Sequence, residues 1–287
     1  MTTVEFTYRY GDRASLRTRP ADADAARLRL DAGNRTFASL LDTLATDGGA
    51  ARYTIDVDPE DLGLLSDAGP PRQRPFAAVL GCSDARVPVE LIFGEGPNDL
   101  FVVRVAGNGL GGDVLGSLRY AIEHLQGSLR LIVILGHSGC GAISAAVDTF
   151  LDPAGYLALA TNHAIRGILD RQLIVVQATA RRLVSAFGTD VTMRKRYREA
   201  LLEASVVTNA ALAAFTVQQE LYGLDTCDLR AVYGVYILQS RRVWTPTADP
   251  GSQEGGLAEP PKDADGFLRF GEAVIQSDRI VSLLESG

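Results

Sequence analysis

Five residues in two short runs carry the groups that could do chemistry in this chain. Cys82, Asp84 and Arg86 lie in GCSDARVP, and His137 and Cys140 lie in LGHSGCGA. Two thiolates and an imidazole are ligands that suit tetrahedral Zn²⁺. A structural zinc site normally has four protein ligands, so a set of three leaves one position for water, as in catalytic sites. The two runs therefore predict a catalytic zinc site.

The carboxylate and guanidinium that follow Cys82 admit several arrangements beside such a metal. Asp84 could ligate the metal itself and close the site. Alternatively, Arg86 could hold Asp84 back with its planar fork, which leaves the metal open and lets the carboxylate accept a hydrogen bond from a metal-bound hydroxide. The pair could also be a surface ion pair that contributes little. The residues alone leave these possibilities open.

Buried strands must bring the two runs together. Short apolar runs predict strands at 76–81, 100–105, 131–135 and 230–239, and helical patterns predict helices at 24–44, 113–126, from 141 onward and through most of 151–226. Alternating strands and helices predict an α/β fold with a mainly parallel sheet flanked by helices. In the strand order 2-1-3-4, the strands before Cys82 and His137 are neighbours, and both ligands follow carboxyl ends at one edge. Cys140 then begins the next helix, where the helix dipole favours a thiolate.

Composition divides the chain into three parts. Residues 1–24 are expected to form an N-terminal arm, in which 4–10 alternate like an edge strand, and Asp113 is expected to cap the helix at 113–126. Residues 25–244 are expected to form the catalytic domain, with a helical insertion at about 151–200. Residues 245–287 are expected to be a Pro-, Gly- and acid-rich linker and a tail that ends in one helix at 267–284.

Charge and cysteine content exclude several classes of protein. The formal net charge of −7 argues against nucleic-acid binding. No run of eighteen uninterrupted apolar residues is present, so we expect no membrane-spanning helix. The first residues lack the basic start and apolar stretch of a secretory signal. Of three cysteines, two belong to the expected site, which leaves no disulfide framework and favours a cytoplasmic location.

The two runs resemble the motifs of β-class carbonic anhydrases. The resemblance extends over CSDARVP (82–88), ELIFGEGPNDLFVVRVAGN (90–108), GSLRYA (116–121) and HSGCGA (137–142), with a weaker match at GNRTF (33–37). It implies one Zn²⁺ per chain on Cys82, His137 and Cys140, beside the dyad of Asp84 and Arg86. It also implies a lyase, carbonate dehydratase, that reversibly hydrates carbon dioxide to bicarbonate and a proton.

The resemblance further implies a substrate pocket at the interface of a homodimer or higher homo-oligomer, lined partly by the neighbouring subunit. The residues that match plant-type pockets, or that would hold carbon dioxide there, are Gln73, Phe101, Val105, Gly107 and Tyr120. Phe101 could equally be a core residue and Tyr120 a packing residue of a helix. Members with a bicarbonate-inhibited closed state usually carry Trp three residues before the first Cys. Val79 stands there instead, which favours the open-site subclass.

Two other functions fit the same ligands. Carbonyl sulfide and carbon disulfide hydrolases are similar to this family and share its metal ligands. A zinc-stabilised scaffold or bicarbonate sensor would need the ligands alone, and the presence of Asp84, Arg86 and Gln73 together argues against it.

Overall fold

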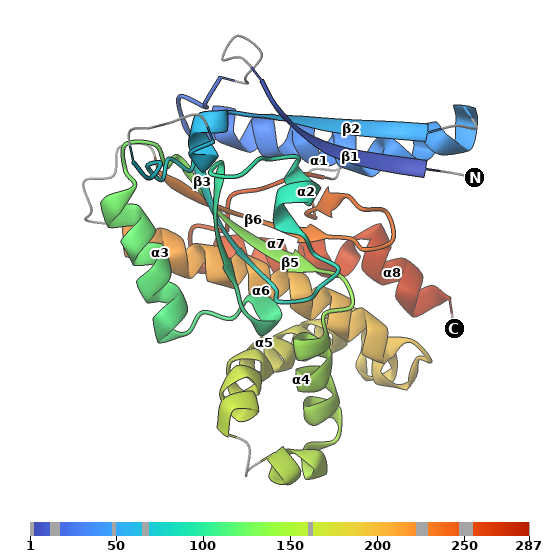
Figure 1. Cartoon of the computed structure of the whole chain (residues 1–287). Helices are drawn as coiled ribbons and strands as arrows, with labels where there is room; N and C mark the ends of the chain where they lie inside the picture. Colours follow the sequence, from blue (N-terminus) through green and yellow to red (C-terminus); the bar gives the residue numbers. More distant parts are fainter. Residues whose placement is uncertain are drawn as a thin grey trace.

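The central sheet places the predicted ligands at one edge of the molecule. The computed structural model describes residues 3–11, 18–47, 50–64, 69–159, 163–221, 229–246 and 255–286. The sheet contains β3 (Ala77–Gly81), β4 (Leu100–Arg104), β5 (Leu131–His137), β6 (Arg230–Tyr236) and β7 (Val243–Trp244). Its order is β4-β3-β5-β6-β7, and only the short β7 runs antiparallel to its neighbour (Figure 1). The predicted α/β class and the strand order 2-1-3-4 are confirmed.

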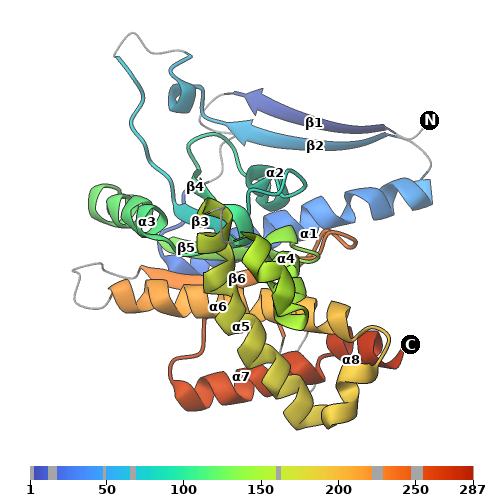
Figure 2. The ribbon, with the colours of Figure 1, turned by 90° about the horizontal axis from the view of Figure 1, so that it is seen from below.

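Helices cover both faces of this sheet. The elements are α1 (Ala23–Asp47), α2 (Val89–Phe93), α3 (Gly112–His124), α4 (Gly141–Leu151), α5 (His163–Phe187), α6 (Tyr197–Leu221), α7 (Ala264–Gln276) and α8 (Asp278–Glu285). Val79 and Val133 pack with α1 and α2, whereas Leu80 and Ile134 pack with the remaining helices. All residues of β3 and β5 are buried, because a parallel sheet covered on both faces has no solvent side. The chain therefore forms three layers (Figure 2).

Helix α6 lies directly against the end of β5. A Cβ on Gly136 would stand 3.3 Å from Val206 Cγ1 and 3.5 Å from Ala210 Cβ, so the glycine permits the close approach. The helix is long and apolar enough to cross a membrane by length and composition, but 72% of its most apolar window is buried inside the structure. Its apolar character thus serves the core between the sheet and α7.

The N-terminal residues form a unit that the sequence prediction captured in part. Strand β1 (Thr3–Tyr10) is an edge strand, as predicted, but it pairs in parallel with β2 (Ala50–Val57), which the sequence analysis missed. Helix α1 makes the crossover between them (Figure 1). The prediction of a helix at 24–44 is confirmed, whereas β1 is part of a β-α-β unit of this chain. The domain boundary at residue 24 stays a prediction.

Part of the predicted linker is structured. Leu257 is buried, and Ala258 exchanges two backbone hydrogen bonds with Tyr233 of β6. Leu257 and Ala258 are therefore attached to the sheet, residues 247–254 lie outside the described residues, and the boundary of the linker and tail stays a prediction. The single helix expected at 267–284 is divided into α7 and α8 by the extended backbone of Ser277.

Two buried side chains of α1 fasten distant segments of the chain. The Asn34 amide donates to the carbonyls of Ile92 and Arg241 and accepts from the Val243 N–H at 2.7 Å. One turn earlier, the Asp31 carboxylate accepts from the Leu257 N–H at 2.9 Å. Burial raises the pKa of Asp31, and the Leu257 N–H and the charges of Arg27 and Arg35 offset this effect only in part. Apart from the bond to Ile92, these contacts join residues more than 200 positions apart in the sequence.

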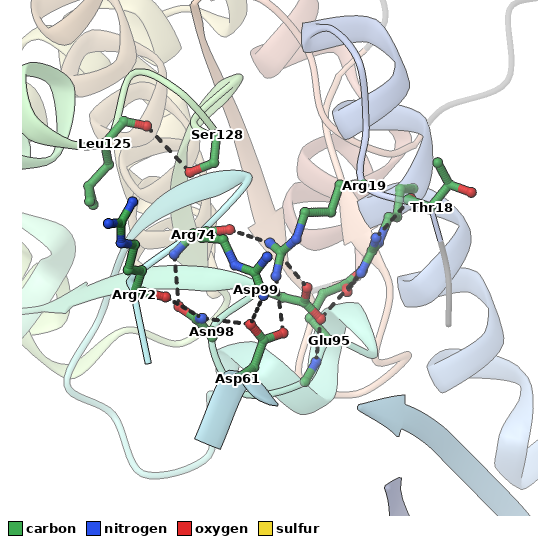
Figure 3. A network of polar contacts seen from close by, with 12 residues as sticks. Thr18, Arg19, Asp61, Arg72, Arg74, Glu95, Asn98, Asp99, Leu125 and Ser128 are labelled. Atoms are coloured by element: carbon green, nitrogen blue, oxygen red, sulfur yellow. Dashed lines mark hydrogen bonds and ion pairs between the residues drawn. The ribbon is translucent and has the colours of Figure 1, made fainter. Parts of the chain in front are cut away.

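A network of charged side chains lies at the amino ends of β3 and β4 (Figure 3). Asp61, in the 3-10 helix Pro59–Leu62, accepts hydrogen bonds from Arg19, Arg74 and Asn98. Glu95 is fully buried, and the Arg29 guanidinium binds both of its oxygens. Arg29 also lies 4.4 Å from the centroid of the Phe76 ring, so the guanidinium is held on two sides. The network connects the N-terminal unit with the sheet.

Candidate metal centre

Three of the predicted ligands meet at the carboxyl edge of the sheet. Cys82 directly follows β3, His137 ends β5, and Cys140 is the residue before α4. All three are buried, and their ligand atoms lie within 4.8 Å of one another. The two runs of sequence are separated by α2, β4 and α3, and they converge as predicted because β3 and β5 are hydrogen-bonded neighbours.

The orientation of His137 leaves one ring nitrogen free. His137 Nδ1 lies 3.1 Å from the carbonyl oxygen of Ser138, to which it can donate a hydrogen bond. That bond fixes the tautomer in which Nε2 carries a lone pair. Nε2 is buried and has no hydrogen-bond partner among the residues that the structure describes. A buried polar atom without a partner costs free energy, so this lone pair is suited to bind a metal ion.

The donor set and its spacing fit zinc. The Sγ atoms of Cys82 and Cys140 are 4.0 Å apart. Two sulfurs bound at about 2.3 Å to one tetrahedral ion stand about 3.8 Å apart, close to that separation. An imidazole nitrogen completes a borderline-soft set that suits Zn²⁺ better than Mg²⁺ or Ca²⁺.

The surroundings of the two thiols shift their pKa values in opposite directions. The hydrogen bond from Cys140 lowers the pKa of Cys82 to about 4, and His137 and the Gly107 N–H act in the same direction against burial. The pKa of Cys140 is raised, because it keeps the shared proton and is buried. The geometry thus already favours one thiolate, which is the ligating form.

Asp84 and Arg86 adopt the held-back arrangement. Arg86 donates from Nε to Asp84 Oδ1 at 3.0 Å and from Nη2 to Oδ2 at 2.7 Å, and its backbone N–H also donates to Oδ1. These bonds hold the pKa of Asp84 well below its usual range. Asp84 Oδ2 is 3.8 Å from His137 Nε2. The carboxylate therefore stands beside the cluster while its oxygens are bound by Arg86.

A tight turn carries Gly107 to the same place. Gly107 lies in the 3-10 helix Ala106–Asn108 with a φ of +66°, which favours glycine, and its N–H donates to Cys82 Sγ at 3.3 Å. Its carbonyl accepts from the amides of Gln172 on α5 and Asn209 on α6. Gly107 was predicted as a pocket residue, and the structure shows that it also binds the first thiol.

The other predicted pocket residues lie in different surroundings. Phe101 and Val105 are half-buried and pack against the larger apolar core. Gln73 is exposed in the loop before β3. Tyr120 is 48% exposed on α3, and its ring stacks on His124 at a centroid distance of 4.5 Å. Asp113, the expected cap of α3, lies inside the first turn, and Gly111 is the capping position.

Sequence reasoning missed the residues that hold the cluster in place. Arg104 donates to the carbonyls of Cys82 and Asp84, Leu238 N–H donates to Ser138 Oγ, and Glu203 accepts from the Gly139 N–H. Arg104 carries a local signal, since a charged residue ends an otherwise apolar strand. Glu203 carries none, because it is one polar residue on a long helix whose position depends on tertiary packing.

Comparisons with known proteins agree with this geometry. The sequence profile described as carbonic anhydrase matches residues 77–233, more than half of the chain. Carbonic anhydrase 2 of Mycobacterium tuberculosis is 47% identical over 88 residues, which are 30% of this chain and 42% of that protein. A carbonic anhydrase of Pseudomonas aeruginosa is 45% identical over 103 residues, 34% of this chain and 46% of that protein. The alignments thus span less than half the length of these curated relatives.

Solved structures give a weaker likeness. A β-carbonic anhydrase from Coccomyxa, in complex with acetazolamide, covers 81% of this chain and 88% of its own with 18% identity and a TM-score of 0.46. That score is too low for the likeness to support the fold assignment, which stands on the sheet order and the profile match. On the profile match over residues 77–233, which includes all three clustered ligands, this chain belongs to the β-class carbonic anhydrase family.

Proposed function

We propose that this chain binds one Zn²⁺ on Cys82, His137 and Cys140 and catalyses the reversible hydration of carbon dioxide to bicarbonate. The observation that carries the proposal is the buried three-ligand cluster with an unpartnered His137 Nε2, next to a carboxylate that Arg86 holds. Zinc, when bound, lowers the pKa of a coordinated water towards about 7 and so supplies hydroxide near neutral pH.

The residues of the chain have separate tasks in this reaction. Arg86 keeps Asp84 ionised and in one orientation, so the carboxylate can accept a hydrogen bond from the attacking oxygen and direct its lone pair. Phe101 and Val105 offer an apolar wall for carbon dioxide. The Gly107 N–H stabilises negative charge on Cys82 throughout.

Gln73 and Tyr120 would act on the metal site of a second subunit. Both are exposed in the single chain, where neither has a described hydrogen bond to the cluster. We propose a homodimer or higher homo-oligomer in which each subunit completes the pocket of its neighbour. A folded, zinc-loaded monomer produced by an interface substitution should have lost hydration activity. Full turnover by such a monomer would rule out the shared pocket and leave the metal site standing.

The decisive experiment measures hydration on metal-quantified protein. Stopped-flow assays of carbon dioxide hydration across pH, with zinc determined by elemental analysis, should give turnover in proportion to zinc content. Carbonyl sulfide and carbon disulfide are offered to the same preparation. Preferred turnover of either sulfur gas would replace the proposed substrate, and zinc-loaded protein without turnover of any of the three would favour a scaffold or sensor.

A further inference from the structure

The loop between His137 and Cys140 has few means of holding its own shape. Gly139 has a φ of +63°, and nothing lies within 4 Å of the position that a Cβ would occupy. Ser138 is held from the side of β6, since its N–H donates to the Tyr236 carbonyl and its Oγ accepts from the Leu238 N–H. Gly139 has no side chain to pack, so its backbone N–H is the group through which α6 can fix the second half of this segment, next to Cys140.

The carboxylate of Glu203 on α6 accepts a hydrogen bond from the Gly139 N–H. Glu203 Oε1 accepts from Gly139 N at 2.8 Å, and the Glu203 side chain is only 11% exposed. Glu203, Val206 and Ala210 lie at helical spacing on one face of α6. Val206 and Ala210 pack against Gly136, so the same close approach that this glycine permits brings Glu203 beneath the loop.

The second oxygen of the Glu203 carboxylate accepts hydrogen bonds from α8. Arg279 donates from Nε to Glu203 Oε2 at 3.0 Å and also from Nη2 to the same oxygen. The Arg279 side chain is 28% exposed, and the buried side chains of Ile280 and Leu284 seat the helix. A largely buried carboxylate without a cation is costly, so the guanidinium of Arg279 compensates the burial of Glu203 and holds the carboxylate in this position.

We propose that Arg279 is a positioning residue of the metal site, acting through Glu203 on the backbone of Gly139. The proposal rests on the zinc site proposed above and gives the C-terminal segment a role in it. Arg279 lies beyond residues 77–233, which match the family profile. The metal-ligand loop is therefore held by a helix outside the matched region.

The alternative is an ion pair that does no more than dock α8 on α6. The chain offers a matched control, because Arg196, just before α6, donates to Ser286 Oγ beyond the end of α8 at 3.2 Å. This contact also joins α6 to the C-terminal helix, but it does not touch Glu203 or the loop. A docking role would make Arg196 and Arg279 equivalent, whereas a positioning role separates them.

The test uses full-length, zinc-loaded protein and the variants Arg279→Gln, Glu203→Ala, their double variant and Arg196→Gln. Zinc release to a chromogenic chelator should be about tenfold faster in Arg279→Gln and at least as fast in Glu203→Ala, as for other groups behind metal ligands. The double variant should release zinc no faster than Glu203→Ala, since both changes remove one clamp. Arg196→Gln should match the wild type. In Co²⁺-substituted protein, the visible bands should shift in Arg279→Gln and not in Arg196→Gln.

Equal zinc release from the wild type and Arg279→Gln would overturn the proposal, as would equal effects of Arg279→Gln and Arg196→Gln. If Arg279→Gln fails to fold by circular dichroism, Arg279→Lys replaces it. Lysine keeps the charge but not the fork, so faster zinc release at an unchanged Tm supports the clamp, and unchanged release contradicts it. A wild type that binds no zinc would instead refute the proposed function, and the clamp with it.

Discussion

The two ends of β3 carry polar clusters of opposite character. At the amino end, Asp61 and Glu95 are surrounded by arginines, and Figure 3 shows the hydrogen bonds that connect them. At the carboxyl end, His137 Nε2 is buried and has no hydrogen-bond partner within the described part of the chain. Two further buried atoms without partners among the described residues, Asn108 Nδ2 and Gln172 Oε1, lie next to Gly107. The strand thus begins beside buried polar groups that have hydrogen-bond partners and ends beside buried polar atoms that lack them.

The difference separates a structural cluster from a chemical one. A buried charge network is retained when its charges neutralise each other, as they do around Arg29. A buried atom that lacks a partner calls for an explanation, and in a cluster of three metal-ligand side chains a bound ion supplies one. Charge density alone would have selected the amino end as the functional site, whereas incomplete hydrogen bonding selects the carboxyl end.

The largest expected effect tests the carboxyl end. Cys140→Ala removes one thiolate, so the protein should lose stoichiometric zinc and hydration activity while its far-UV circular dichroism stays unchanged. Loss of a direct ligand should exceed the roughly 10–100-fold effect of groups behind ligands. Elemental analysis is the measurement, and a wild-type zinc content in this variant would refute the ligand assignment.

Substitutions in the charged network at the amino end of β3 should lower the stability of the protein and leave its zinc content unchanged. Arg29→Met leaves the fully buried Glu95 without the arginine that binds both of its oxygens, which should cost about 3–5 kcal/mol of unfolding free energy. Arg52→Met, which breaks an exposed pair with Glu5, should cost less than about 1 kcal/mol. Urea unfolding gives both values. Zinc loss in folded Arg29→Met would show that the two clusters are coupled.

The dyad should affect turnover and leave metal binding intact. Asp84→Asn removes the acceptor, and Arg86→Ala frees the carboxylate to move towards the metal. Each should lower kcat for hydration about 100-fold with zinc retained. Near-native turnover in both variants would mean that this half-exposed pair is an ordinary surface ion pair.

The smallest expected effect concerns the exposed ion pair between Arg198 on α6 and Asp148 on α4. Arg198 binds both oxygens of Asp148 and lowers its pKa. Because the folded pKa lies below the unfolded value of about 3.9, the pair stabilises above about pH 4 and loses its contribution as pH falls through the folded pKa. Asp148→Asn should cost about 0.5 kcal/mol at pH 7 and less at pH 3. An equal or larger cost at pH 3 would contradict the assigned sign.

Local pattern predicted most of the sheet and all of the clustered ligands. The buried strands and the motif glycines are short-range signals, and parallel pairing of β3 with β5 then brings Cys82 to His137. Strand β2 was not predicted, although Tyr53, Ile55 and Val57 alternate with polar residues. The alternation is short and lies between a strong helical pattern and a Pro-rich loop. Ile55 and Val57 of β2 are buried, but its parallel partner β1 is mostly exposed and therefore lacks the apolar run that marks a buried strand.

The supports of the metal loop could not be predicted in the same way. Gln172, Asn209 and Glu203 act through their position on α5 and α6, which depends on helix packing against the sheet and leaves no motif in the sequence. Whether Gln73 and Tyr120 reach a metal site depends on a second subunit and stays a prediction.

The contacts of α1 also determine the order in which the molecule can assemble. Asn34 and Asp31 bind backbone groups near residues 241–243 and 257, so each contact closes a loop of more than 200 residues. Closing such loops costs chain entropy, which places these contacts late in folding. By the same argument they should open early in unfolding. Amide hydrogens at Val243 and Leu257 should therefore exchange through a local opening, ahead of those in β3 and β5.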